Sequence, residues 1–119
     1  MSATIGIGRW LLRVPACRSL KQKRSVVRSL RDRLRSRYSV SVAETDFQDD
    51  VQRAELTVAI AASDRTLAES MLSKLDDVVC SDPRIYIIER DVRVTSPGSG
   101  YSRDRDPWGE SWQEDDFPG

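Results

Sequence analysis

The chain has 119 residues, of which 39% are hydrophobic and 32% are charged, and this length and composition indicate one globular domain and exclude two of ordinary size. Its 19 basic side chains cancel its 19 acidic ones, so the total charge indicates neither a general polyanion-binding protein nor an acidic solvating chain. No histidine is present, which excludes a Ser-His-Asp triad and a histidine-ligated zinc site. We predict no cofactor and no catalytic residues.

The charges are segregated along the chain. Residues 1–38 carry eleven basic side chains and one acidic, residues 39–94 carry six and twelve, and residues 95–119 carry two and six. Cys17 and Cys80 stand far apart, and Arg9 and Arg13 interrupt the apolar start, so we expect no signal peptide and no membrane span. This pattern predicts a cytoplasmic protein with two unpaired thiols; a disulfide or redox pair is the alternative.

The first two predicted elements are a strand and a helix. Residues Thr4–Val14 alternate between two faces, and Pro15 ends the strand because proline cannot donate to a ladder. Ser19 is a suitable N-cap for a helix that runs to about Tyr38. Its apolar positions recur by threes, fours and sevens: Leu20, Val27, Leu30, Leu34 and Tyr38.

Two strands, a helix and a last strand follow. Alternating residues on both sides of a short polar segment predict an antiparallel hairpin of Ser39–Asp46 and Arg53–Ser63. The second helix begins near Asp64, where Thr66 and Glu69 have the spacing of a capping box. Its apolar stripe comprises Leu67, Met71, Leu72, Leu75, Val78 and Val79. The helix stops at Ser81-Asp82-Pro83, and Arg84–Val94 is the final strand.

This β-α-β-β-α-β order predicts an α+β fold of the ferredoxin-like type over residues 1–94. In that fold a four-stranded antiparallel sheet carries two helices on one face. Residues 95–119 are rich in Gly, Pro, Ser and acidic residues, interleaved with aromatic ones, and show no apolar period. We expect this acidic tail to be disordered. It is either an inert solubilising segment or a competitor that folds back onto the basic part of the chain.

The first predicted helix carries a row of basic side chains, called here the basic row. Five cations fall within an arc of about 80° over about 21 Å of helix. They are Lys21, Arg24, Arg28, Arg31 and Arg35, while Lys23, Arg33 and Arg37 add cations on other sides. Only Asp32 offers an acid, so the helix cannot neutralise itself by i,i+4 pairs. The basic row predicts contacts with phosphates, of RNA ahead of DNA or an acidic protein. A merely solvated helix face is the alternative.

The face of the sheet without helices lacks the stacking aromatics of an RNA-recognition motif. Its predicted residues in the first strand include Ile7 and Leu11, and this apolar surface predicts self-association of two sheets into a homodimer. The run Gly6-Ile7-Gly8 lacks the third glycine and the following helix of a dinucleotide fingerprint, so it predicts no nucleotide site. Glu44, Glu89 and Asp91 are interpreted as surface charges of the strands.

The connections Pro15–Arg18, Asp46–Gln52 and Ser81–Pro83 are expected at one end of the sheet. This loop end is the alternative functional site, where a regulatory module would hold a small molecule near Cys17, Phe47 and Arg53. An enzyme that uses an Asp or Cys there is the least favoured alternative. Three carboxylates of one turn could hold a hard cation, but such turns are common and we predict no metal. They are Asp46, Asp49 and Asp50.

The stretch SLKQKRSVVRSL, from Ser19 to Leu30, and the stretches VSVAE, QD and QRAELTVA, between Val40 and Ala59, resemble the YlxP-like family of small bacterial proteins of unknown function. The resemblance covers residues 4–94 and implies a ferredoxin-like fold. Because genes of the family often lie near those of translation-initiation and ribosome-maturation factors, it also implies, by association only, a role near RNA or the small ribosomal subunit. The family often has histidines where this chain has Arg18 and Phe47, so no histidine-dependent chemistry is implied. We predict a non-enzymatic RNA- or ribosome-associated binding protein.

Overall fold

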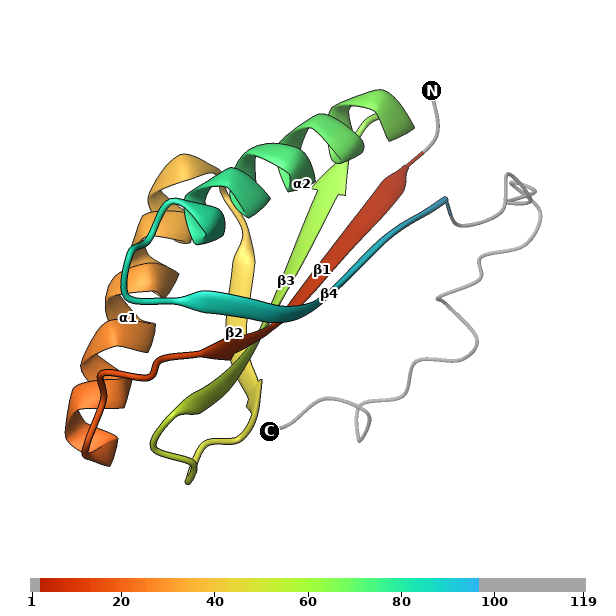
Figure 1. The fold of residues 1–119 in the computed structure, drawn as a ribbon. Helices are drawn as coiled ribbons and strands as arrows, with labels where there is room; N and C mark the ends of the chain where they lie inside the picture. The colour runs from red at the N-terminus through yellow and green to blue at the C-terminus, as the bar shows by residue number, and fades with distance from the viewer. Residues whose placement is uncertain (1–2, 97–119) are drawn as a thin grey trace, which may run out of the picture.

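A computed structural model describes residues 3–96, which form a four-stranded antiparallel sheet with two helices on one face (Figure 1). The elements are β1 (Thr4–Arg13), α1 (Leu20–Arg37), β2 (Ser41–Asp46), β3 (Arg53–Ala62), α2 (Arg65–Cys80) and β4 (Tyr86–Thr95). The strand order β2-β3-β1-β4 places β1 and β3 in the centre, and each neighbouring pair is antiparallel. This arrangement confirms the predicted ferredoxin-like fold. From residue 97 onward, the predicted acidic tail lies outside the described residues.

The central strand β1 supplies the floor of the core. Trp10 and Leu12 point under the helices and are 0% and 1% exposed. The Trp10 indole donates a hydrogen bond to Asp76 Oδ1 of α2 at 2.8 Å, so the ring is both buried and satisfied. A Cβ on Gly8 would lie 2.5 Å from the Trp10 ring, and the glycine therefore makes room for the indole. Close packing against the Trp10 ring therefore explains why a glycine occupies this position.

The two helices begin at side-chain caps. The Ser19 hydroxyl accepts a hydrogen bond from Gln22 N at 3.1 Å, which confirms the N-cap predicted for α1. The capping box predicted for α2 at Thr66 is wrong, because Asp64 precedes it and its carboxylate accepts from Leu67 N at 2.7 Å. With this start, Ala68 faces the sheet and Leu67, which was expected in the core stripe, is 44% exposed. The buried stripe of α2 consists of Ala68, Leu72, Leu75 and Val79.

Both cysteines are free thiols. Cys17 lies in the β1–α1 connection and is buried, whereas Cys80 is exposed at the end of α2. Although Cys80 is exposed, partial desolvation of its thiol by neighbouring atoms raises the pKa of this group, and the nearby Asp76 carboxylate raises it further. Among the described residues, no helix is long and apolar enough to cross a membrane.

Candidate nucleic-acid interface

The basic row runs along α1 beside the edge strand β2. Four of its five side chains are exposed and Arg31 is half-buried. The Arg35 guanidinium donates to the Val42 carbonyl of β2 at 3.2 Å, which fixes one end of the row against the sheet. Within residues 3–96, the side chains of Lys21, Arg24 and Arg28 make no ion pair or side-chain hydrogen bond. Three neighbouring cations are thus presented to solvent, and no described residue neutralises them.

Lys23 does not belong to this surface, and its prediction as an additional exposed cation is wrong. Its side chain is 0% exposed, because it lies in phase with the apolar stripe of α1 and points toward the sheet. Its ammonium donates to the carbonyls of Phe47 at 2.6 Å, Gln48 at 3.3 Å and Arg53 at 3.1 Å. Lys23 therefore holds the β2–β3 loop against α1, including Phe47, whose φ of 61° is rare for a bulky residue.

A shallow depression opens on the basic row, lined by Arg24, Val27, Arg28, Arg31 and Glu44. Glu44 comes from β2, where it follows Val42 on the face that α1 covers, and its side chain is 19% exposed. The expectation that Glu44 is a surface charge is therefore wrong. Its Oε2 is buried without a hydrogen-bond partner among residues 3–96 and lies 3.8 Å from Lys23 Nζ. The Nε of Arg31 is likewise buried and has no hydrogen-bond partner in the described part of the chain.

Arg33, on the opposite side of α1, is engaged within the protein. Its guanidinium lies 3.3 Å from Asp82 Oδ2, and Arg84 lies 2.7 Å from the same oxygen. The hydrogen bond from the Arg84 side chain, opposed in part by burial, lowers the pKa of Asp82. Arg33 thus joins α1 to the α2–β4 connection, and its guanidinium faces away from the basic row.

Two residues of the alternative loop-end site, Phe47 and Arg53, contact each other. The Arg53 guanidinium stacks over the Phe47 ring at 4.6 Å, and its Nε donates to Asp50 Oδ2 at 2.8 Å. The pKa of Asp50 is lowered, mainly by the hydrogen bond from the Gln52 backbone and to a smaller extent by the hydrogen bond from the Arg53 side chain. In the stretch from residue 3 to residue 96, no group of three Cys, Asp or Glu side chains gathers as a metal site. The loop-end carboxylates instead order their own turn.

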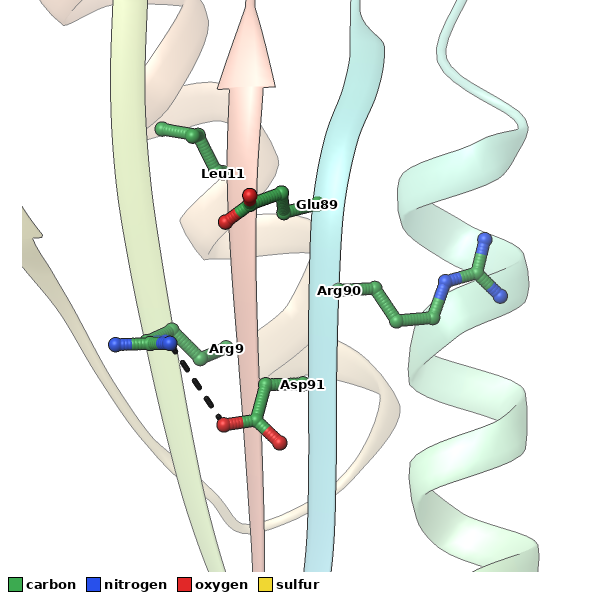
Figure 2. A pocket seen from close by; sticks show the side chains of 5 residues that line it. All are labelled: Arg9, Leu11, Glu89, Arg90 and Asp91. Carbon is green, nitrogen blue, oxygen red and sulfur yellow. Dashed lines mark ion pairs between the residues drawn. The ribbon is translucent and has the colours of Figure 1, made fainter.

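The sheet face without helices combines apolar and charged residues. On β1, Ile5 and Ile7 are 39% and 38% exposed. Toward the loop end, Arg9 lies 3.7 Å from Asp91 of β4, beside Leu11 and Glu89 (Figure 2). Figure 2 also shows Arg90 pointing to the other side of β4, where it pairs with Asp76 of α2 at 2.8 Å. The alternation predicted for β1 is confirmed by this burial pattern.

Comparison with known proteins identifies the family of the chain. Residues 5–92 match the family described as "Protein of unknown function (DUF503)", so the chain belongs to this family. It is 33% identical, over 67 residues, to the uncharacterized protein YlxP of Bacillus subtilis (strain 168), which covers 56% of this chain and 73% of the relative. The resemblance that the sequence suggested is therefore confirmed, and neither description assigns an activity.

Solved structures provide further comparisons. A de novo designed protein, Foldit4, is 15% identical with a TM-score of 0.48, over 81% of this chain and 99% of the design. A second design, with a ferredoxin fold, is 19% identical with a TM-score of 0.43, over 87% and 95%. A dimeric ferredoxin-like protein from an uncultured marine organism is 12% identical with a TM-score of 0.40, over 82% and 96%. These scores are low, and the fold assignment follows from the element and strand order.

Proposed function

We propose that this protein is a non-enzymatic RNA-binding protein that contacts the phosphate backbone through the basic row. The observation that supports the proposal is a set of exposed cations on one helix that have no ion-pair partner among residues 3–96, namely Lys21, Arg24 and Arg28. Residues that are seven positions apart on this helix, such as Lys21 and Arg28, are separated by about 10 Å along its axis. The row can therefore follow a nucleic-acid backbone over several phosphates. Ribosomal RNA of the small subunit is the partner that we propose to test first, in a cytoplasmic setting.

The loop-end alternative has no comparable support. Arg53, Phe47 and Asp50 are already in contact with one another, so a small molecule there would have to displace those contacts. Lys21, Arg24 and Arg28 of the basic row have no such internal partners among residues 3–96. We therefore retain one function, RNA binding.

The test compares two triple charge reversals that change the net charge equally. Lys21→Glu/Arg28→Glu/Arg35→Glu removes three cations of the basic row, and Arg65→Glu/Lys74→Glu/Arg93→Glu removes three exposed cations elsewhere. Each phosphate contact contributes about 0.7 to the slope of log affinity against log salt on single-stranded RNA, so the first variant loses about two units of slope. Co-sedimentation with ribosomal subunits and with protein-free ribosomal RNA, over a salt series, provides the measurement.

Equal loss in the two variants would show a net-charge effect and contradict the assignment to α1. Absence of binding by the unmodified protein, at low as well as high salt, would contradict RNA binding altogether.

We further propose that a second copy of the chain covers the open sheet face. Four strands of up to ten residues span roughly 600 Å² in projection, close to the roughly 800 Å² per partner of an ordinary dimer interface. Exposed Ile5 and Ile7 supply an apolar centre, and the charges of Arg9, Glu89 and Asp91 supply a rim of both signs, as a self-complementary interface requires.

Sedimentation equilibrium tests the dimer with two matched variants. Ile7→Glu places a carboxylate at the apolar centre and yields a monomer, whereas Leu67→Glu alters an equally exposed leucine on α2 and leaves the dimer intact. Circular dichroism verifies that both variants are folded. A monomeric unmodified protein at micromolar concentration would overturn this assembly, and so would a folded Ile7→Glu dimer.

A further inference from the structure

The depression on the basic row is lined by two residues that each carry one buried polar atom, a donor and an acceptor, without a hydrogen-bond partner among residues 3–96. The donor is Arg31 Nε and the acceptor is Glu44 Oε2. Both residues line the same depression, together with Arg24 and Arg28. Most buried polar atoms of folded proteins have a hydrogen-bond partner, so two exceptions of opposite kind in the lining of one depression need an explanation. A ligand that both accepts and donates would supply it when the Glu44 and Arg31 side chains turn toward it.

Lys23 does not supply the partner that Glu44 needs. An ammonium has three protons, and those of Lys23 are directed at the carbonyls of Phe47, Gln48 and Arg53. Its Nζ lies 3.8 Å from Glu44 Oε2, which gives electrostatic attraction but lies beyond hydrogen-bond distance. The carboxylate therefore keeps its capacity to accept.

A carboxylate beside these arginines also weakens the binding of a phosphate backbone that brings no hydrogen-bond donor. The negative charge of Glu44 repels any phosphate that Arg24, Arg28 and Arg31 attract. A ligand offsets this repulsion if it brings a hydrogen-bond donor to the carboxylate together with its phosphate. The RNA backbone does so, because each phosphate is accompanied by a 2′-hydroxyl, whereas the backbone of DNA presents acceptors only.

We propose that Glu44 and Arg31 form a ribose-phosphate subsite in which the Glu44 carboxylate accepts a hydrogen bond from a 2′-hydroxyl and Arg31 donates to the adjacent phosphate. This inference rests on the proposed RNA binding and adds the discrimination of RNA from DNA. The position of Glu44 suits the role, because it lies on the edge strand β2 with 19% of its side chain still open to solvent. Arg24 and Arg28 supply the flanking phosphate contacts.

The experiment measures the affinity of the full chain for three oligonucleotides of one sequence: RNA, 2′-fluoro RNA and DNA. The 2′-fluoro strand keeps the sugar geometry of RNA and removes only the donor. A charge-assisted hydrogen bond corresponds to about tenfold in affinity, so the unmodified protein binds RNA about tenfold more tightly than 2′-fluoro RNA. Glu44→Ala reduces this ratio to less than about twofold and strengthens DNA binding, because the repulsion is gone.

Two further variants separate the subsite from general charge effects. Glu69→Ala removes an exposed carboxylate of α2 and leaves the ratio unchanged. Arg31→Lys keeps the charge but removes Nε, and it lowers the affinity for all three oligonucleotides by the same factor. Melting temperatures confirm that each variant is folded.

The possible failures are distinguishable. Equal binding of the three oligonucleotides, with the basic row still required, overturns the subsite and leaves the proposed function standing. An RNA preference that persists in Glu44→Ala overturns the role of this carboxylate. Binding of none of the three contradicts the proposed function itself.

Discussion

Replacement of Lys23 by methionine tests the most unusual feature of α1, a fully buried lysine. The substitution keeps the length of the side chain and removes its charge and its three hydrogen bonds. The carbonyls of Phe47, Gln48 and Arg53 lose their common donor, and Glu44 loses the only cation within 4 Å among residues 3–96. The variant therefore leaves several polar groups unsatisfied at once.

The magnitude follows from these groups. Removal of one partner of a buried, hydrogen-bonded charge costs about 3–5 kcal/mol, and the apolar burial of methionine offsets only a part of this. A domain of this size has about 5–15 kcal/mol of stability in total, so Lys23→Met loses a large fraction of it. At about 4–8 °C per kcal/mol, the melting temperature falls by roughly 15 °C or more.

Urea unfolding followed by circular dichroism at the helix band measures the effect. Lys21→Met is the matched control, because this lysine is exposed two residues away and its loss changes stability by less than about 0.5 kcal/mol. Glu44→Gln added to Lys23→Met restores part of the loss, since the uncompensated carboxylate is then neutral. A loss below about 1 kcal/mol in Lys23→Met would refute the structural role assigned to the lysine.

Three other predictions concern the polar contacts of Asp82, Trp10 and Cys80. The pKa of Asp82 is lowered in the fold, so its stabilising contribution is complete above the unfolded value near 3.8 and is lost as the pH falls through the lower folded value. Asp82→Asn, which weakens the pairing with Arg84, therefore costs about 1–3 kcal/mol at pH 7 and makes acid unfolding below pH 4 less steep; equal acid sensitivity of the two proteins would contradict this. Trp10→Phe loses the hydrogen bond to Asp76 and ring volume, and thermal melting should show a loss of about 1–3 kcal/mol, with an unchanged melting temperature as the opposing result. Since the pKa of Cys80 is raised, its alkylation at pH 8 is slower than that of an unfolded control peptide, and Asp76→Asn accelerates it; a rate as fast as the peptide's would be incompatible with this environment.

The fold was predictable because each element has a local signal. Alternation in β1, the 3.6-residue period of α1 and the Ser19 cap are properties of short stretches, and the structure reproduces them within a few residues. The start of α2 shows where local reasoning is ambiguous. Asp64 and Thr66 are both good caps, and the burial of Ala68 in place of Leu67 decides between them.

The candidate site was predictable only in part. The helical period alone places the five cations of the basic row on one side of α1, as the structure does. The same period places Lys23 in phase with Leu30 and Leu34, which is a signal for burial that its charge obscured. Nothing local reveals its acceptors, because they come from a loop 24 to 30 residues further along the chain.

The sequence by itself determined the order of elements, the basic row and the family, because periodicity, capping and motif similarity reside in neighbouring residues. Only the tertiary structure decided which charges are free. It pairs Arg33 with Asp82 and brings Glu44 beside Arg31, through contacts between segments distant in the chain. Whether a charged residue is a surface group, a core donor or part of a site depends on which partner the packing of α1 on the sheet places within a few ångströms.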